Sequence, residues 1–302
     1  MKSESQFSTP ILFIIFNRPD TTQIVFNKLK QLKPKKLYIS ADGPRKNKDG
    51  EAEKCKLTRE IINQVDWECD VKKLFNDENL GCKKAVSNAI TWFFENEDQG
   101  IILEDDVVPA KSFFDFCSSL LAYYKDDSDI MHISGNNFFS ERIDIPFSYY
   151  FSIYPHIWGW ATWRRAWKLF NAQIPDFPEY KSNNSIDSIL KDRREKKYWL
   201  RKFELVYNNQ VDTWDYQWLY TIWKNKALCI TPVKNLATNI GFRDDATHTV
   251  NKNSKLADIP VEEINNIVHP DKKIISQSFD KITFQEIHYL SLLDKIKIKL
   301  GF

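Results

Sequence analysis

The sequence of 302 residues predicts an α/β fold in which a mixed, mostly parallel sheet is flanked by helices. Two observations lead to this prediction. Short apolar runs alternate with segments whose apolar residues recur at helical spacing through the first half of the chain, which is typical of βαβ units. Polar clusters also follow three of the apolar runs directly, as expected where parallel strands end at a ligand-binding edge.

The elements follow one another at ordinary spacing. Residues 11–16 (ILFIIF) predict the first strand, and Pro19 with an apolar stripe through Leu29 predicts the next helix. The rest of the first half is expected to contain a strand at 37–40, a helix at 54–64, a strand at 71–75, a helix at 82–95 and a strand at 101–103. In the less regular second half we expect helices at 189–208 and 214–225 and a long loop at 239–254.

Three consecutive acids, Glu104, Asp105 and Asp106, follow the strand at 101–103. Pro109 is expected to turn the chain away, which leaves the acids at the carboxyl end of the strand. Adjacent carboxylates raise one another's pKa unless a cation or hydrogen-bond donors compensate. Because Mg²⁺ and Mn²⁺ use one or two carboxylates together with water and phosphate oxygens, the pattern favours a metal site that binds a nucleotide diphosphate. Alternatively, the acids are loop residues or favourable charges at the start of the next helix.

Two further polar clusters follow strands: Asn17-Arg18 after the first and Asp42-Gly43-Pro44 after the second. Parallel strands bring their carboxyl ends to one edge of a sheet, so we expect both clusters to meet the acids there. The sequence has no G-x-G-x-x-G turn and no G-x-x-x-x-G-K-[ST] loop. Dinucleotide redox chemistry and P-loop phosphoryl transfer therefore lack their usual signals.

Composition narrows the class of protein. The 43 basic and 41 acidic residues leave a net charge of +2, and without a dense basic block nucleic acid is not an expected partner. The five cysteines include no C-x-x-C pair, which favours a reducing cytoplasm over a disulfide framework. No signal pattern or membrane-spanning run is present. Residues 289–302 mix Leu and Ile with Lys, and we expect either peripheral membrane contact or a packed terminal helix.

Aromatic residues make up 14% of the chain, and a segment at 149–167 is especially rich in them. Trp158, Gly159 and Trp160 lie in this segment. Gly159 would let a ligand approach the backbone, and indole faces would cover sugar C–H groups. The three residues are therefore expected to form a donor or acceptor wall, with core packing as the alternative.

Eight motifs occur in a fixed order: FNRPD (16–20), SADGP (40–44), NLGCKKAV (79–86), LEDDVVPAKSFF (103–114), SGNN (134–137), IWGWATWRRAW (157–167), TWDYQW (213–218) and NIGFRDDATHT (239–249). On these motifs the chain, over residues 9–249, resembles the GT-A fold glycosyltransferases related to N-acetylglucosaminyltransferase I, including bacterial cytosolic relatives. The resemblance implies a Rossmann-like sheet and a nucleotide diphosphate sugar as donor.

The resemblance also implies roles for individual residues. Asp106 would be the ligand of Mn²⁺ (or Mg²⁺), while Asp105 and Glu104 would face the ribose and the donor sugar. Arg18 and Asp42 match positions that hold the base and ribose, and a guanidinium also suits pyrophosphate or a stacked base. Otherwise Arg18 is a surface ion-pair partner.

Asp215 in the TWDYQW motif matches the family's catalytic base. An inverting transfer needs a carboxylate that takes the proton of the acceptor hydroxyl, and Trp214 and Trp218 would desolvate it and raise its pKa. The alternative is an acid that stabilises the first turn of a helix.

Three other candidates are cationic or titratable. Lys83 and Lys84 open a helix beside the site and would meet phosphate charge, or else lie on a solvated helix face. His248 would reach the diphosphate or metal from a loop that orders over the donor, or else is structural or solvated.

Together these observations predict a metal-dependent inverting glycosyltransferase that moves a hexose or N-acetylhexosamine from a nucleotide diphosphate donor, with UDP favoured. A saccharide or glycolipid in surface glycan synthesis is the expected acceptor. We expect a nucleotide-sugar-binding half at 1–145, an acceptor and catalytic half of the same domain at 146–255, and a helical extension at 256–302. A sugar nucleotidyltransferase and a non-catalytic carbohydrate-binding protein are the alternatives.

Overall fold

The computed structural model describes residues 6–242, 256–257 and 259–289. The strands are β1 (Ile11–Ile15), β2 (Lys36–Ala41), β3 (Asp70–Phe75), β4 (Gln99–Glu104), β5 (Val107–Pro109), β6 (Ile130–Ser134), β7 (Tyr149–Ser152), β8 (Trp160–Trp163), β9 (Leu228–Pro232) and β10 (Ala237–Asn239). The α-helices are α1 (Pro19–Leu32), α2 (Glu51–Glu60), α3 (Cys82–Asn96), α4 (Lys111–Tyr123), α5 (Arg164–Trp167), α6 (Phe177–Ser182), α7 (Arg193–Tyr207), α8 (Asp215–Lys224) and α9 (Gln277–Thr283). Short 3₁₀ helices η1 (Ile61–Gln64), η2 (Ser140–Arg142) and η3 (Ser185–Ser188) and a π-helix, η4 (Phe284–His288), complete the described elements.

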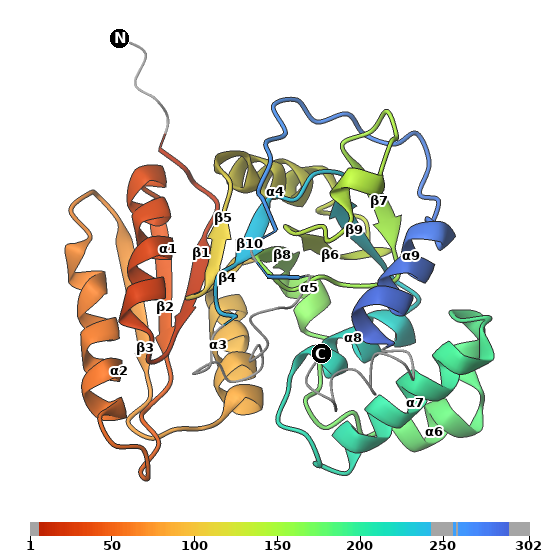
Figure 1. Cartoon of the computed structure of the whole chain (residues 1–302), viewed down its shortest axis with the longest axis horizontal. Coiled ribbons are helices and arrows are strands. Elements are labelled where there is room, and N and C mark those ends of the chain that lie inside the picture. The colour runs from red at the N-terminus through yellow and green to blue at the C-terminus, as the bar shows by residue number, and fades with distance from the viewer. Residues whose placement is uncertain (1–5, 243–255, 258, 290–302) are drawn as a thin grey trace, which may run out of the picture.

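The central sheet has eight strands in the order β3-β2-β1-β4-β8-β6-β9-β7 (Figure 1). Strands β3, β2, β1 and β4 pair in parallel, and β6 pairs in parallel with β9. β8 runs antiparallel between β4 and β6, and β7 is antiparallel to β9. The predicted α/β class with a mixed, mostly parallel sheet is therefore confirmed.

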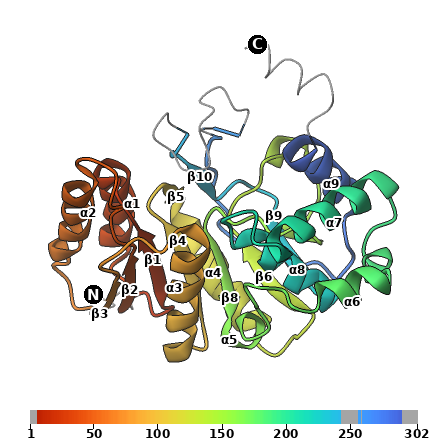
Figure 2. The same cartoon turned by 90° about the horizontal axis from the view of Figure 1, so that it is seen from below.

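Helices cover both faces of the sheet because successive strand residues point in opposite directions. In β1, Leu12 packs into the cluster that contains Ile90 of α3, while Phe13 packs into the cluster that contains Phe26 of α1. Figure 2 shows α1 and α2 on one side of β1, β2 and β3 and α3 on the other. The carboxyl ends of β1, β2 and β4 consequently share one edge.

Local signals explain where the helices begin and end. Pro19 is at the start of α1, and Lys33 ends this helix in a left-handed conformation, with its N–H bonded to the carbonyl of Leu29. α7 begins at residue 193, four residues later than expected, because Asp192 accepts hydrogen bonds from the backbone N–H groups of residues 194 and 195.

The second half of the chain is built around aromatic side chains. Seven of the ten tryptophans are buried: Trp160, Trp163, Trp167, Trp199, Trp214, Trp218 and Trp223. Large rings bury much apolar area each, so this cluster joins α7 and α8 to the sheet without long strands. Core packing thus accounts for most of the tryptophan content.

The segment expected to be a helical extension is extended for much of its described length. Glu263 accepts hydrogen bonds from the backbone N–H groups of Lys111 and Ser112 at 3.1 and 2.7 Å, and so caps α4. Ser276 N–H donates to the carbonyl of Phe151 at 2.9 Å, and only then does α9 begin. Hydrogen bonds to α4 and β7, rather than helix propensity, thus decide the conformation of residues 259–276, which we call the strap. Residues 290–302 lie outside the described ranges.

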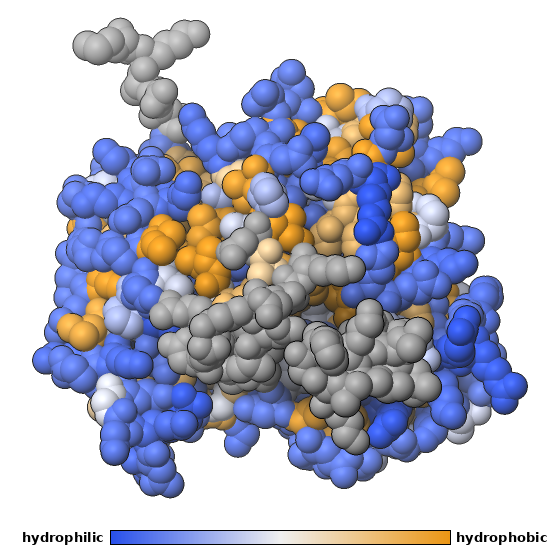
Figure 3. Space-filling model, viewed as in Figure 1, coloured by the Kyte–Doolittle hydropathy of each residue, from blue (hydrophilic) through white to orange (hydrophobic). Residues whose placement is uncertain are grey.

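The outer surface is mainly hydrophilic on the face seen in Figure 3. No helix within residues 6–242, 256–257 and 259–289 has an apolar stretch of the length needed to span a membrane. All five cysteines lie in the described ranges, and each is free.

Candidate functional site

The strand-end acids meet Arg18 at the edge of the sheet. Arg18 follows β1, and Asp105 and Asp106 follow its parallel neighbour β4, so the pairing of the two strands brings them together. Arg18 Nη2 lies 2.5 Å from Asp105 Oδ1, and Nη1 lies 2.9 Å from Asp106 Oδ2. Burial opposes the charge of Arg18, but the two carboxylates outweigh it and raise the pKa of the guanidinium. Arg18 is therefore a largely buried partner of both acids and not a surface ion-pair residue.

The acids are separated from the next helix by a strand. β5 begins directly after Asp106 and pairs antiparallel with β10, and Pro109 ends β5 rather than turning the chain away. α4 begins only at Lys111, where Glu263 caps it. The acids are therefore not first-turn charges of the following helix.

The backbone after β10 packs directly on Asp106. Ile240 N–H donates to the carbonyl of Asp106 at 2.8 Å, and Asn239 Oδ1 accepts from the N–H of Gly241 at 2.7 Å. A Cβ on Gly241 would lie 2.2 Å from Asp106 Oδ2 and 2.9 Å from Arg18 Nη1. Only a glycine fits here while the ion pair keeps its place.

Asp106 retains features of a metal ligand. Its Oδ2 pairs with Arg18, whereas its Oδ1 has no hydrogen-bond partner within the described part of the chain. Groups of three or more His, Cys, Asp or Glu placed to hold a metal are not found among the described residues. Because Mg²⁺ and Mn²⁺ need only one or two carboxylates when phosphate and water complete the shell, Asp106 fits a hard divalent ion as a single-carboxylate ligand.

Asp42 lies at the same edge, but its carboxylate is already hydrogen-bonded to the loops that follow β2 and β3. Its carboxylate accepts hydrogen bonds from the N–H groups of Gly43 and Leu80 and from the side-chain amides of Asn76 and Asn79, at 2.8 to 3.1 Å. A Cβ on Gly43 would lie 2.4 Å from the backbone carbon of Glu78. Asp42 thus fixes the loops after β2 and β3 instead of presenting a free carboxylate to a ribose.

Asp215 comes to the acids from the other half of the chain. It is the first residue of α8 and accepts a hydrogen bond from Thr213 Oγ1. Asp215 therefore does lie in the first turn of a helix, as the alternative interpretation of the sequence predicted. Burial and the charges of Asp106, Asp105 and Asp215 raise the pKa of Glu104, while Arg18 opposes them. Asp215 is therefore close enough to act on Glu104 electrostatically.

Cys82 lies among the same acids. Burial raises the pKa of its thiol, and the charges of Glu104, Asp212, Asp215 and Asp42 raise it further. The charges of acids from β4, from the turn after β2, from the loop before α8 and from α8 itself thus act on the first residue of α3. The predicted convergence of polar residues at this edge is observed for Arg18, Asp42 and residues 104–106, and the charge of Asp215 acts on Glu104.

The loop before α8 is attached to the start of α3. Asp212 accepts hydrogen bonds from the N–H groups of Cys82 and Lys83, each at 3.0 Å, and Lys83 Nζ donates to Asn209 Oδ1 at 2.8 Å. Gly81 passes so close that a Cβ would lie 2.7 Å from Asp212 Oδ2. Lys83 is buried, and its ammonium group is engaged with this loop rather than with the strand-end acids. Lys84 is exposed, as on a solvated helix face.

The Trp-Gly-Trp segment is divided between surface and core. Trp160 is fully buried in β8 and stacks on Trp214 with ring centroids 5.5 Å apart, so it lines no ligand wall. Gly159 has φ of 66°, and its carbonyl accepts from the N–H of Gly135 at 2.7 Å, which explains the glycine without a ligand. Trp158 is half-buried and packs edge-on against Phe242, whose segment also covers Asp106.

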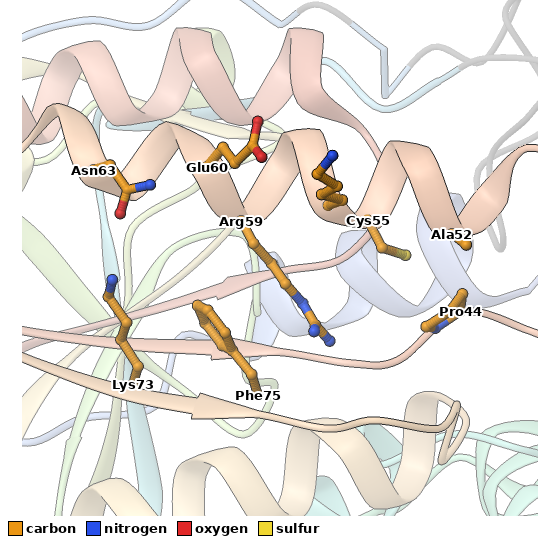
Figure 4. Close-up of a pocket in the computed structure, with 9 residues that line it drawn as sticks. Pro44, Ala52, Cys55, Arg59, Glu60, Asn63, Lys73 and Phe75 are labelled. Atoms are coloured by element: carbon orange, nitrogen blue, oxygen red, sulfur yellow. The ribbon is translucent and has the colours of Figure 1, made fainter.

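A separate cavity of about 330 Å³ opens between α2 and β3 (Figure 4). Its lining includes Arg59, Cys55 and Phe75, and none of the strand-end acids. Arg59 donates to the carbonyls of Asp42 and Asn76 at 3.1 and 2.6 Å, so it supports the loops that hold Asp42. The cavity therefore neighbours the candidate site without being part of it.

Two residues that pack on the candidate site could not be named from the sequence. Asp212 and Gly241 lie inside or next to recognised motifs, but a polar loop residue and a glycine carry no signal of a partner more than a hundred residues away. His248, by contrast, was expected to join the site and lies outside the described residues.

No protein-family model matches the chain. No curated protein matches it either. Among solved structures, it is similar to a mannosyltransferase from Pyrobaculum calidifontis in complex with GDP-Man and Mn²⁺, with a TM-score of 0.36, 10% identity, and coverage of 73% of this chain and 70% of that one.

Similar proteins also include HddC from Yersinia pseudotuberculosis, with a TM-score of 0.31, 11% identity, and coverage of 52% and 77% of the two chains. An apo UDP-glucose pyrophosphorylase has a TM-score of 0.35, 9% identity, and coverage of 74% and 90%. None of the three is named as an N-acetylglucosaminyltransferase, so that relationship stays a prediction. At TM-scores below 0.5, these similarities assign no activity to this chain.

Proposed function

We propose that the protein is an inverting glycosyltransferase that takes a sugar from a nucleotide diphosphate donor and transfers it to a saccharide acceptor. The observation that carries this proposal is the position of Asp215. It stands at the start of α8, from the second half of the chain, and acts electrostatically on Glu104 at the carboxyl end of β4. Carboxylates from two separate halves of the chain thus influence one another electrostatically, which supports a reaction in which donor and acceptor meet between them.

In this reaction Asp215 takes the proton of the acceptor hydroxyl as its oxygen attacks the anomeric carbon. Arg18 holds Asp105 and Asp106 in place at the donor side. Mn²⁺ or Mg²⁺ on Asp106, when bound, would neutralise the charge of the diphosphate leaving group. UDP is the favoured nucleotide, a hexose or N-acetylhexosamine the favoured sugar, and surface glycan synthesis the favoured setting.

One feature argues against a sugar nucleotidyltransferase. Such an enzyme usually binds phosphate through a glycine-rich loop after the first strand. Here the turn between β1 and α1 contains no glycine, and the N–H of Phe16 already donates to Asp105 Oδ2 at 3.0 Å. The backbone N–H of Phe16 in this turn is therefore already bonded to a carboxylate and is not free to bind phosphate.

The decisive experiment is calorimetric titration of UDP, GDP and CDP with Mn²⁺ or with a chelator. We expect one nucleotide to bind only with metal, and Asp106→Ala to weaken it by about tenfold or more, because the variant removes the charged ligand. Asp144→Asn, an exposed aspartate, is the control. Equal affinity in Asp106→Ala and wild type would remove the metal assignment.

The two rival functions have their own signatures in parallel assays. Consumption of a nucleoside triphosphate with release of pyrophosphate would identify a nucleotidyltransferase. Binding of glycans with no nucleotide affinity under any condition would identify a carbohydrate-binding protein.

A further inference from the structure

Three polar side chains beside Asp215 have no hydrogen-bond or ionic partner among the described residues. They are Tyr198 and Lys202 on α7 and Tyr216 on α8, and each is half-buried. The ammonium of Lys202 lies 5.3 Å from the ring centroid of Tyr198 and 5.3 Å from that of Tyr216. Two helices that pack together thus frame one cation between two tyrosines.

Electrostatic effects place this group next to the candidate base. Burial raises the pKa of Tyr198 and of Tyr216, and the charge of Asp215 adds to both effects. Burial lowers the pKa of Lys202, and Asp215 opposes that change. Tyr216 follows Asp215 directly in α8, and the charge of Asp215 acts on all three side chains.

His288 adds no negative charge to this group. It is half-buried, and its desolvation, followed by the charges of His156 and Lys202, lowers its pKa to about 3. It is therefore uncharged near neutral pH and supplies no counter-ion to Lys202. The Lys202 ammonium is therefore partly desolvated and lies against both tyrosine rings, and neither it nor the two phenol hydroxyls has a hydrogen-bond acceptor among the described residues.

A partly buried ammonium without a partner is costly, and an anionic oxygen would satisfy it with a charge-assisted hydrogen bond. The tyrosine rings supply apolar faces suited to sugar C–H groups, and their hydroxyls can bond to sugar hydroxyls. We propose that Tyr198, Lys202 and Tyr216 form the acceptor subsite and bind a saccharide that carries a carboxylate or phosphate group. This inference rests on the proposed function, because it identifies the acceptor side by the position of Tyr216 next to the proposed base Asp215 in α8.

The test compares binding of three small probes: methyl β-glucuronide, glucose 6-phosphate and the neutral methyl β-glucoside. Affinities are measured by NMR titration, with and without UDP and Mn²⁺, on wild type, Lys202→Gln and Lys202→Arg. Lys197→Gln is the matched control, since Lys197 is an exposed lysine of the same helix. We expect at least one anionic probe to bind about tenfold more tightly than the glucoside, as one charge-assisted hydrogen bond predicts.

Lys202→Gln should abolish this preference, while Lys202→Arg and Lys197→Gln should retain it. Preference for the glucuronide would assign a carboxylate acceptor, and preference for the phosphate a phosphorylated one. Equal binding of all three probes to wild type, or an unchanged preference in Lys202→Gln, would overturn the inference. If the nucleotide titrations succeed while the preference is missing, the acceptor inference alone fails. If the preference is present without nucleotide binding, the proposed function fails instead.

Discussion

Arg18 and Asp105 lie 87 residues apart in the sequence and meet in a largely buried ion pair, with Nη2 and Oδ1 separated by 2.5 Å. The pair exists because β1 and β4 are neighbours in the sheet, so the residues that follow them share its edge. It also supplies the compensating cation that three adjacent acids require.

Replacing Arg18 with Ala should destabilise the protein by about 3–5 kcal/mol, because Asp105 would remain buried without its partner. Urea unfolding of the purified variant measures this loss. Arg142→Ala is the control, since its pair with Glu286 is solvent-exposed and should contribute less than about 1 kcal/mol. Equal losses of unfolding free energy in the two variants would show that the Arg18 pair contributes no more to stability than an exposed ion pair does.

Replacing Gly241 with Ala should cost about 1–3 kcal/mol, because the new methyl group overlaps Asp106 and Arg18 and forces them apart. A double-mutant cycle with Asp106→Ala isolates the cause. Removing the Asp106 carboxylate should make the Gly241 substitution much less costly. Additive effects of the two substitutions would place the strain elsewhere.

Replacing Asp215 with Asn should lower turnover by about two to four orders of magnitude while nucleotide affinity stays unchanged, because general-base catalysis is lost and the donor side is untouched. Release of the nucleoside diphosphate from its sugar donor measures turnover, and calorimetry measures affinity. Asp144→Asn serves again as the exposed control. Turnover within a few-fold of wild type would exclude Asp215 as the base.

Asp280 should make stability fall as the pH rises. Burial raises its pKa from 3.8 to about 7, while hydrogen bonds from Ser152 and the N–H of Ile153 oppose the change. Between these pH values the folded state binds a proton at Asp280 more tightly than the unfolded state does. The stabilisation that this proton gives the folded state is therefore complete below pH 3.8 and is lost as the pH rises through about 7. At about 1.4 kcal/mol per pH unit, the loss is at most on the order of 4 kcal/mol.

Replacing Asp280 with Asn should remove this contribution. Urea unfolding of wild type and variant from pH 4 to 8 measures the difference in slope, and Asp144→Asn should leave the slope unchanged. Parallel curves for wild type and Asp280→Asn would contradict a raised pKa at this site.

Several features of the fold were predictable because they depend on neighbouring residues. The apolar run of β1, Pro19 at the start of α1 and the stripe of α3 encode their elements through local periodicity and helix-start chemistry. The strap that precedes α9 was not predictable, because Glu263 and Ser276 take their hydrogen-bond partners from α4 and β7.

The site shows the same division. Residue type and position after a strand were enough to select Arg18, Asp42 and the acids 104–106 as neighbours. They could not reveal that neighbouring loops hydrogen-bond the carboxylate of Asp42, or that Lys83 donates a hydrogen bond to Asn209. Nor could they reveal that Trp160 is fully buried in the core. Each of those outcomes depends on which distant side chain occupies the space nearby.

The sequence by itself determined the α/β class, the order of the elements through the strand that ends at Glu104 and the set of polar residues at the strand ends. Strand alternation, helical spacing and strand-end chemistry act over a few residues, so they can be read locally. Only the tertiary structure decided that Arg18 neutralises the acids, that Asp212 ties the loop before Asp215 to α3, and that Tyr198, Lys202 and Tyr216 gather beside Asp215. Those contacts join residues far apart in the chain, so packing of the whole molecule selects them.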